Sequence, residues 1–348
     1  MASGGVLECP FGGARLAPAP QCGTATGERR EDMSEEDPRP EHLAYDLNKV
    51  LSSIVGLKTH VPEDAFTAPI LGTERSGNGV VIREDGLILT IGYLVTEAET
   101  VWITDNRGRA VPGTVLGYDQ ETGFGLVQAL GALDLPALEI GNSSDLSEGD
   151  PVVLAGHGGR RAAVKAQVIG VREFAGYWEY LIDEAIFTAP AHPNWGGTAM
   201  LGADGRLLGI GSLFIQQSQG GGQPVDGNMV VPIDLLKPIY EDMVTYGMPN
   251  RPPRPWLGLY GTEMENRLVV AGLSDGGPAE QADVQVGDVI AKVDGHPVAS
   301  LADFLRQVWA TGPAGSTIPL TVARDGELLE LTIESVARRA LLKGPKLH

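Results

Sequence analysis

Short apolar runs separated by turn residues recur along most of the chain, and they predict a mainly β protein. Val80-Val81-Ile82 and Leu87-Ile88-Leu89 flank the turn Glu84-Asp85-Gly86, and an Asp-Gly pair between two apolar runs is a strong signal for a β-hairpin. We expect further strands at 101–104, 111–118, 163–171, 180–187 and 207–211. The 47 glycines and 24 prolines fit a chain with many turns.

The same pattern predicts short helices and a boundary between two folded regions. Apolar spacing predicts a helix within 44–55 and another from Ile233 to Tyr246 that ends at Gly247. The run N-R-P-P-R-P at 250–255 predicts a stiff, extended linker. We therefore divide the chain into a disordered acidic, Pro/Gly-rich tail (1–43), a first domain (44–247), a Pro-rich linker (248–255) and a second domain (256–340).

Composition narrows the partners that this chain could have. Its 43% hydrophobic and 20% charged residues are ordinary for a soluble protein, but its net charge is −19. Such a surface repels nucleic-acid phosphates and anionic lipids, so we expect neither partner. There is no run of about 18 apolar residues to span a membrane, and the first thirty residues lack the apolar segment of a signal peptide. We therefore expect a cytoplasmic protein.

The two cysteines, Cys9 and Cys22, both lie in the tail, and their spacing is not that of a metal or redox motif. We expect two free thiols there, and neither a metal nor a cofactor in the folded region. Met1 and Met33 are both candidate starts.

Residues 192–200 read H-P-N-W-G-G-T-A-M and precede an Asp204-Gly205 turn. This stretch resembles the G-N-S-G-G block that carries the nucleophile of trypsin-like serine proteases. Trp195 stands at the serine position, and an indole offers an N–H donor but no nucleophilic oxygen. Pro193 stands where the family has the glycine whose N–H helps to hold the oxyanion, and proline has no N–H to give.

Two upstream stretches resemble the HtrA family of trypsin-like proteases. Residues 77–90 are similar to its G-S-G-V-I-I … G-Y-I-L-T run, after which the general-base histidine follows; here Tyr93 stands at that position. Residues 119–127 are similar to its D-x-x-T-D-L-A-V-L run, and Gly123 replaces the aspartate that orients the histidine. A phenol with a pKa near 10 is a poor base at neutral pH. The resemblance therefore implies that the whole catalytic triad is vacated.

The second domain resembles the PDZ domain of the same family. Trp256-Leu257-Gly258-Leu259 is similar to its Y-L-G-I strand, and 277–298 follows its S-P-A-x-x-A … G-D-V-I-x-x-V-N-G pattern. The resemblance covers about residues 48–337. It implies a trypsin-like double six-stranded β-barrel followed by a PDZ domain.

From this resemblance we expect a catalytically inactive pseudoprotease that acts as a peptide-binding or scaffold protein and forms an oligomer, such as a homotrimer. A PDZ domain binds a protein C-terminus or an unfolded segment as an added strand and takes its carboxylate at a loop. Arg254 would supply a cation near that loop, because Pro255 lacks an N–H. The expected peptide-binding residues are Arg254, Trp256, Leu257, Gly258, Leu259, Phe304 and Val308.

Several alternatives remain open at this point. Trp195 either plugs the former active-site cleft or enters the core, and we expect the plug because its loop has little core to enter. His192, beside it, is expected to face solvent or to stack. Two other functions also fit: a serine endopeptidase of this family with non-standard catalytic residues, or a structural subunit whose groove is unused.

Overall fold

The computed structural model describes residue 38 and residues 43–178, 180–217 and 224–343. The expected disordered tail, with Cys9 and Cys22, therefore lies outside the described residues except for Pro38 and Leu43. The chain forms two compact units. The first contains Met1–Arg172, Glu184–Pro249 and Lys343–His348, and the second contains Glu173–Asp183 and Asn250–Leu342. The segment 173–183 thus belongs to the second unit, whereas the domain ranges expected from the sequence place it in the first domain.

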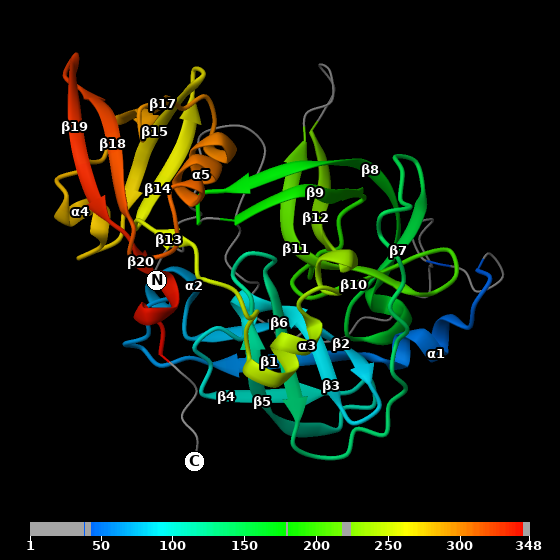
Figure 1. The fold of residues 1–348 in the computed structure, drawn as a ribbon. Coiled ribbons are helices and arrows are strands. Elements are labelled where there is room, and N and C mark those ends of the chain that lie inside the picture. Colours follow the sequence, from blue (N-terminus) through cyan, green and yellow to red (C-terminus); the bar gives the residue numbers. More distant parts are fainter. Residues whose placement is uncertain (1–37, 39–42, 179, 218–223, 344–348) are drawn as a thin grey trace, which may run out of the picture. The chain divides into compact units, whose positions relative to one another are not determined.

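The first unit begins with a closed six-stranded antiparallel barrel in the order β1-β2-β3-β6-β5-β4 (Figure 1). The predicted hairpin is confirmed, since Val80 pairs with Leu89 and Val81 with Ile88. Every residue of β3 is buried. The strands are β1 (Ile54–His60), β2 (Glu74–Arg83), β3 (Leu87–Ile91), β4 (Thr100–Thr104), β5 (Ala110–Tyr118) and β6 (Phe124–Ala129).

A second closed barrel follows in the order β10-β11-β12-β9-β8-β7. The two barrels confirm the expected double six-stranded β-barrel. Strand β8 extends further toward the turn that it shares with β9 than the apolar pattern indicates, and β9 extends two residues further at its other end. The strands are β7 (Pro151–Ala155), β8 (Ala163–Gly176), β9 (Tyr180–Ala189), β10 (Ala199–Leu201), β11 (Leu207–Gln217) and β12 (Val225–Pro232).

The helices of the first unit are short. The helix expected in 44–55 is α1 (Leu47–Ser52), where Asp46 accepts from the backbone N–H of Asn48 and Lys49. The single helix expected from Ile233 to Tyr246 is wrong: a 3₁₀ turn (Ile233–Leu235) and α3 (Tyr240–Tyr246) flank Pro238, which cannot donate the backbone hydrogen bond of a continuous helix. The other helical segments are α2 (Ala68–Leu71) and 3₁₀ turns at Gly92–Leu94 and Gly159–Ala162.

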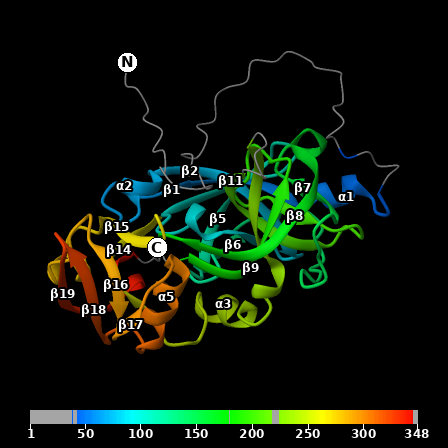
Figure 2. The same cartoon turned by 90° about the horizontal axis from the view of Figure 1, so that it is seen from above.

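The second unit has a sheet in the order β14-β15-β16-β18-β19, with α5 (Leu301–Ala310) packed beside it (Figure 2). Strand β14 pairs with β15 alone, so it lies at an edge of the sheet. The strands are β14 (Leu259–Met264), β15 (Arg267–Leu273), β16 (Val289–Val293), β17 (His296–Pro297), β18 (Thr317–Arg324) and β19 (Glu327–Glu334), with a separate pair β13 (Pro255–Trp256) and β20 (Val336–Ala337). Helix α4 (Pro278–Gln281) and a 3₁₀ turn at Arg338–Leu341 complete the unit.

Helix α5 is fixed at its N-terminus by two side chains. Ser300 Oγ accepts from the N–H of Asp303 (3.0 Å), as an N-cap does. Glu263 Oε1, on β14, accepts from the N–H of Leu301 (2.8 Å). The apolar face of α5 joins the core of the unit through Leu301, Phe304, Leu305 and Val308. Strand β14 and helix α5 are therefore neighbours that are tied together at one end.

We predict that Gly117→Ala loosens the docking of α3. A Cβ at Gly117, in β5, would overlap the backbone carbonyl of Gly247, which ends α3 with φ +74°. Backbone can yield only by moving α3 away, so we expect a loss of about 1–3 kcal/mol in the free energy of unfolding, measured by urea denaturation. Gly131→Ala is the matched control, because a Cβ there would lie 3.4 Å from Val111, an ordinary contact. Equal effects of the two substitutions would contradict this account.

Candidate functional site

The structure brings the three expected triad positions together. Tyr93 lies in the 3₁₀ turn after β3, and the N–H of neighbouring Gly92 donates to the carbonyl of Gly123 (2.6 Å). Tyr93 also reaches the loop of Trp195, because a Cβ on Gly196 would lie 2.7 Å from the Tyr93 hydroxyl. One continuous set of contacts thus links Tyr93, Gly123 and the 192–197 loop.

Tyr93 acts here as a hydrogen-bond donor. Its hydroxyl donates to the backbone carbonyl of Ser212 in β11 (2.9 Å). Burial raises the pKa of Tyr93 well above its usual value, and a hydrogen bond with the Trp195 side chain opposes that rise. The phenol is therefore neutral at physiological pH and committed to a backbone acceptor.

A buried arginine holds the segment that carries Tyr93. Arg75 is 2% exposed, and its guanidinium donates to the carbonyls of Tyr93 (2.8 Å) and Thr96 (2.9 Å) and to the hydroxyl of Thr67 (2.7 Å). Burial lowers the pKa of Arg75 to about 10, while nearby Glu97 opposes that shift. Arg75 therefore stays charged at neutral pH and fixes the backbone within the turn and just after it.

Trp195 lies partly buried at the edge of the second barrel. Its ring centroid is 5.5 Å from that of Phe214 in β11, with the planes tilted by 42°. The carbonyl of Trp195 accepts from both the N–H (3.1 Å) and the hydroxyl (2.9 Å) of Thr198. Thr198 thus closes a tight turn with Trp195.

Asn78, in β2 of the first barrel, binds this loop from the other side. Its Nδ2 donates to the carbonyls of Asn194 (2.8 Å) and Gly196 (2.9 Å), and its backbone N–H donates to Gly196 again (2.8 Å). Its Oδ1 accepts from the N–H of His157 (2.8 Å). Gly197 has φ +77°, and a Cβ there would overlap the carbonyl of Asn78. The sequence analysis missed Asn78, although it falls at the serine of the family's G-S-G-V-I-I run.

The expectation that His192 faces solvent or stacks is wrong. His192 is 1% exposed, Nε2 lies 3.0 Å from the carbonyl of Ala162, and Nδ1 lies 3.1 Å from the N–H of Asn194. A carbonyl can only accept and an N–H can only donate, so Nε2 carries the proton and Nδ1 is bare. Burial lowers the pKa of His192 below 6.5. His192 is a neutral, structural residue whose ring binds the backbone of the 192–197 loop at Asn194.

In the second unit, the residues expected to form the carboxylate loop are mostly buried. Trp256, Leu257 and Leu259 are each 2–3% exposed. Gly258 has φ +70°, a conformation that favours glycine, and its carbonyl accepts from the N–H of Ser274 (2.8 Å). The hydrogen bond from Ser274 thus fixes the backbone of this stretch, which leads directly into the edge strand β14.

The remaining expected peptide-binding residues lie on or beside α5. The guanidinium carbon of Arg254 lies 3.8 Å from the ring centroid of Trp309, in the last turn of the helix. Phe304 and Val308 are 3% and 2% exposed and belong to the core cluster of the unit. Their burial leaves them little surface for a ligand unless the groove between β14 and α5 opens.

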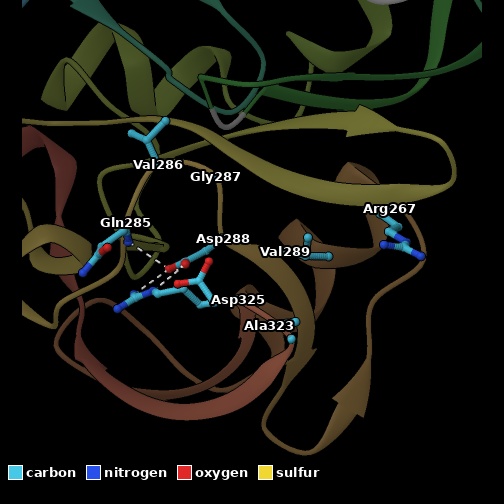
Figure 3. Close-up of a pocket in the computed structure, with 10 residues that line it drawn as sticks. Arg267, Gln285, Val286, Gly287, Asp288, Val289, Ala323 and Asp325 are labelled. Carbon is cyan, nitrogen blue, oxygen red and sulfur yellow. Dashed lines mark hydrogen bonds and ion pairs between the residues drawn. The ribbon is translucent and has the colours of Figure 1, made fainter.

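A separate surface pocket of about 450 Å³ lies at the turns that join β16, β18 and their neighbours (Figure 3). Asp288, in its wall, is 1% exposed and accepts from Arg324 Nε (2.7 Å) and Nη2 (2.8 Å). Since these charges satisfy each other, the pocket wall offers little to a ligand. The pocket includes none of the expected peptide-binding residues.

Comparison with known proteins identifies two domains in the chain. Residues 77–210 match the trypsin-like peptidase domain, and residues 255–334 match the PDZ domain. Together with the two barrels, these matches define a trypsin-like protein with a PDZ domain. The curated relatives include DegP and DegQ proteins, and the chain resembles the HtrA family, as the sequence motifs indicate.

The relatives have low sequence identity to this chain but match most of its length. A probable periplasmic serine endoprotease, DegP-like, of Pseudomonas fluorescens is 28% identical over 75% of this chain and 56% of its own length. The periplasmic pH-dependent serine endoprotease DegQ of Escherichia coli is 25% identical over 86% of this chain and 71% of its own. The chain spans a little over half the length of the DegP relatives that it matches.

Solved structures agree on the fold. The HtrA-type protease AlgW with a decapeptide has a TM-score of 0.51 and 22% identity, covering 86% of this chain and 99% of that chain. The same protease with a tripeptide has a TM-score of 0.50 and 23% identity, covering 86% and 97%. At this identity the likeness establishes the architecture alone.

The expectation of a cytoplasmic protein is wrong. The curated relatives are named periplasmic endoproteases, which points to a compartment outside the cytoplasm. The expectation rested on the lack of an apolar signal-peptide segment in the first thirty residues. Among the described residues, no helix combines the length and apolarity needed to cross a bilayer.

We predict that unit 1 loses stability as pH falls below about 6.5, the unperturbed pKa of histidine. Because the folded state holds His192 with a lowered pKa, the unfolded chain binds the proton first, and the free energy of unfolding decreases from pH 7 toward pH 5. Urea denaturation at the two pH values measures the change. His192→Gln keeps a donor and an acceptor but cannot titrate, so its pH dependence should be smaller. An unchanged pH dependence in that variant would exclude His192 as the source.

Proposed function

We propose that this chain is a catalytically inactive HtrA-type protein that acts as a scaffold and binds peptides or protein C-termini through its PDZ domain. The observation that supports this most is the convergence of Tyr93, Gly123 and the Trp195 loop at one place, with no serine, threonine or cysteine at the triad positions. The contacts that link these three positions argue against an error in assigning them.

Each vacated position removes a separate part of the chemistry. Trp195 has no atom that can attack a carbonyl carbon. Tyr93 cannot accept a proton at neutral pH, because its pKa is raised and its hydroxyl already donates to Ser212. Gly123 has no side chain to orient a base, and Pro193 has no N–H for an oxyanion. The partly exposed indole against Phe214 supports the plug interpretation of Trp195.

Magnitudes favour inactivity. A serine protease without its triad keeps about 10³–10⁴-fold acceleration over water, through the oxyanion hole and substrate binding. Loss of one oxyanion donor removes about 10²–10³-fold. Dividing the first factor by the second leaves only about 1- to 100-fold acceleration over water.

The PDZ domain keeps features that a peptide ligand needs. Strand β14 lies at a sheet edge, where a peptide can add as a further strand. The turn at Gly258 precedes this strand, and Arg254 places a cation on the last turn of α5. We assign the ligand carboxylate to this corner, with Arg254 in place of the donor that Pro255 cannot supply.

The names of the relatives favour a second candidate, a serine endoprotease with non-standard catalytic residues. A fluorophosphonate probe and a casein assay distinguish the two. We expect no labelling within 48–247 and no casein hydrolysis by the purified chain. Labelling of any residue in that range, together with hydrolysis that the probe inhibits, would establish the endoprotease instead.

Trp195→Ser alone should not create a protease. The new hydroxyl would face Tyr93, which neither accepts a proton nor has a carboxylate at Gly123 to orient it, and Pro193 would still lack a donor. Catalytic groups that act as a unit recover little when one is restored. Peptide-ester hydrolysis should therefore stay at the background rate.

The matched comparison is the chain with Tyr93→His, Gly123→Asp, Trp195→Ser and Pro193→Gly together, the only variant in which we expect detectable turnover. Its rate will stay far below that of an evolved protease, because the loop that Asn78 holds must also take the productive geometry. Phosphonate-sensitive hydrolysis by the single Trp195→Ser variant would reveal a working base elsewhere in the cleft.

The PDZ domain should bind a fluorescently labelled decapeptide ending in Leu-Phe-Val with a micromolar or weaker dissociation constant, measured by fluorescence anisotropy. Amidation of the peptide C-terminus should weaken binding at least tenfold, because it removes the charge that the loop and Arg254 read. Gly258→Trp should abolish binding, since a side chain at φ +70° would strain the loop and meet Trp256 and Ser274. Equal affinity for the free and amidated peptides would reject recognition of the C-terminus.

A further inference from the structure

Three segments of the first unit meet at the side chain of Asn106, which lies in the turn between β4 and β5. Its Nδ2 donates to the carbonyl of Leu51 in α1 (2.7 Å). Its Oδ1 accepts from the N–H of Gly158 (2.8 Å), in the loop between β7 and β8. One side-chain amide thus joins helix α1, a turn of the first barrel and a loop of the second barrel.

Two further contacts hold the same corner. Arg160, in the 3₁₀ turn of the β7–β8 loop, donates from Nε to Asn48 Oδ1 of α1 (2.8 Å). Nε2 of His157, in the same loop, lies 3.1 Å from the carbonyl of Asp105, the residue before Asn106. The loop therefore contacts both α1 and the turn of the first barrel directly.

This corner is basic in a chain whose net charge is −19. Its three segments, 46–52, 105–109 and 157–162, carry five basic and two acidic side chains. The basic residues are Lys49, Arg107, Arg109, Arg160 and Arg161, and the acidic residues are Asp46 and Asp105. The local excess of charge is therefore opposite in sign to that of the whole protein.

Both carboxylates of the corner are already engaged. Asp46 is the N-cap of α1 and accepts from two backbone N–H groups in the first turn of that helix. Asp105 is 1% exposed and accepts from the backbone N–H groups of Arg107 and Arg109 (2.9 Å each). It also pairs with the guanidinium of Arg109 (3.3 Å), so its charge is used within its own turn.

The other cations of the corner have no carboxylate partner among the residues that the structure describes. They are Lys49, Arg107, Arg160 and Arg161, and all four are exposed. Exposed cations elsewhere in this unit, such as Lys58 and Arg206, do form ion pairs. Like charges that share a corner repel one another, so several cations at once would stabilise an anion bound there.

We propose that this corner binds a small phosphate compound that carries more than one phosphate group. Three of the four cations are arginines, and a guanidinium donates two parallel hydrogen bonds to phosphate oxygens. Two phosphate groups carry about −3 to −4 charges together at neutral pH, which matches four cations. The site lies entirely within the first unit and is independent of peptide binding by the PDZ domain.

The overall charge of the protein indicates that the ligand is small. A nucleic acid or an anionic membrane extends past the corner and meets the acidic surface around it. A compact anion feels mainly the local cations, because salt screens charges beyond about 8 Å at physiological ionic strength. The same chain can therefore repel long polyanions and bind a short one.

The experiment uses the full chain and inorganic tripolyphosphate in a buffer without divalent cations. Isothermal titration calorimetry should show saturable binding of one tripolyphosphate per chain. The midpoint temperature of thermal unfolding should rise with the ligand, because a ligand that binds only the folded state stabilises it. Sodium chloride at the same ionic strength should give no comparable rise.

The variant that tests the site is Arg107→Gln with Arg161→Gln. Neither side chain hydrogen-bonds to another described residue, so the fold should be kept and the melting temperature without ligand should stay close to that of the unmodified chain. The affinity for tripolyphosphate should fall by about tenfold or more, because charge-assisted hydrogen bonds are lost. The matched control is Arg267→Gln with Lys292→Gln, which removes two exposed cations from the second unit and should leave the affinity unchanged.

Three results would overturn the inference. The first is the absence of saturable binding, with a thermal shift no larger than that of sodium chloride. The second is an equal loss of affinity in the site variant and the matched control, because the binding would then follow net charge and not this corner. The third is equal affinity for citrate, which would reject phosphate as the group that is recognised. Saturable binding that only the site variant weakens supports the inference.

Discussion

The contact of Asn78 with the 194–197 loop is the constraint on which the candidate site depends. One side chain from the first barrel donates to two carbonyls of a loop in the second, and its own carbonyl lies where any side chain on Gly197 would be. Buried amide groups are costly when unpaired, so this arrangement forces the two barrels and the loop to fold as one set. The contact holds the 194–197 loop against the barrel that carries Tyr93 and Gly123.

The polar side chains around the candidate site are hydrogen-bonded to backbone groups. Arg75 donates to the carbonyls around the Tyr93 turn, Tyr93 donates to Ser212, and His192 uses both ring nitrogens on backbone groups. Each of these groups is committed to a backbone partner.

The second unit joins an edge strand with the tip of the β8–β9 hairpin (173–183) from the barrel. The edge of β14 offers backbone groups for strand addition, and the hairpin tip contacts β14 through Tyr177 and α5 through its ion pairs with Arg306. Exposed ion pairs and an aromatic pair are among the contacts that hold the hairpin tip, and each exposed ion pair stabilises little on its own.

The sequence by itself determined the mainly β architecture, the resemblance to the HtrA family and the identity of the residues at the positions that match the triad, because alternation, Asp-Gly turns and family motifs are local signals. It also indicated that Trp195, Tyr93 and Pro193 lack the groups that catalysis requires, since that follows from side-chain chemistry alone. Tertiary structure decided the break at Pro238, the burial of His192 and the partners of Asn78. It also decided that the hairpin belongs with the PDZ domain. These depend on contacts between residues up to more than a hundred positions apart, such as Asn78 with Asn194 and Arg306 with Glu173, and no local pattern encodes which distant groups will meet.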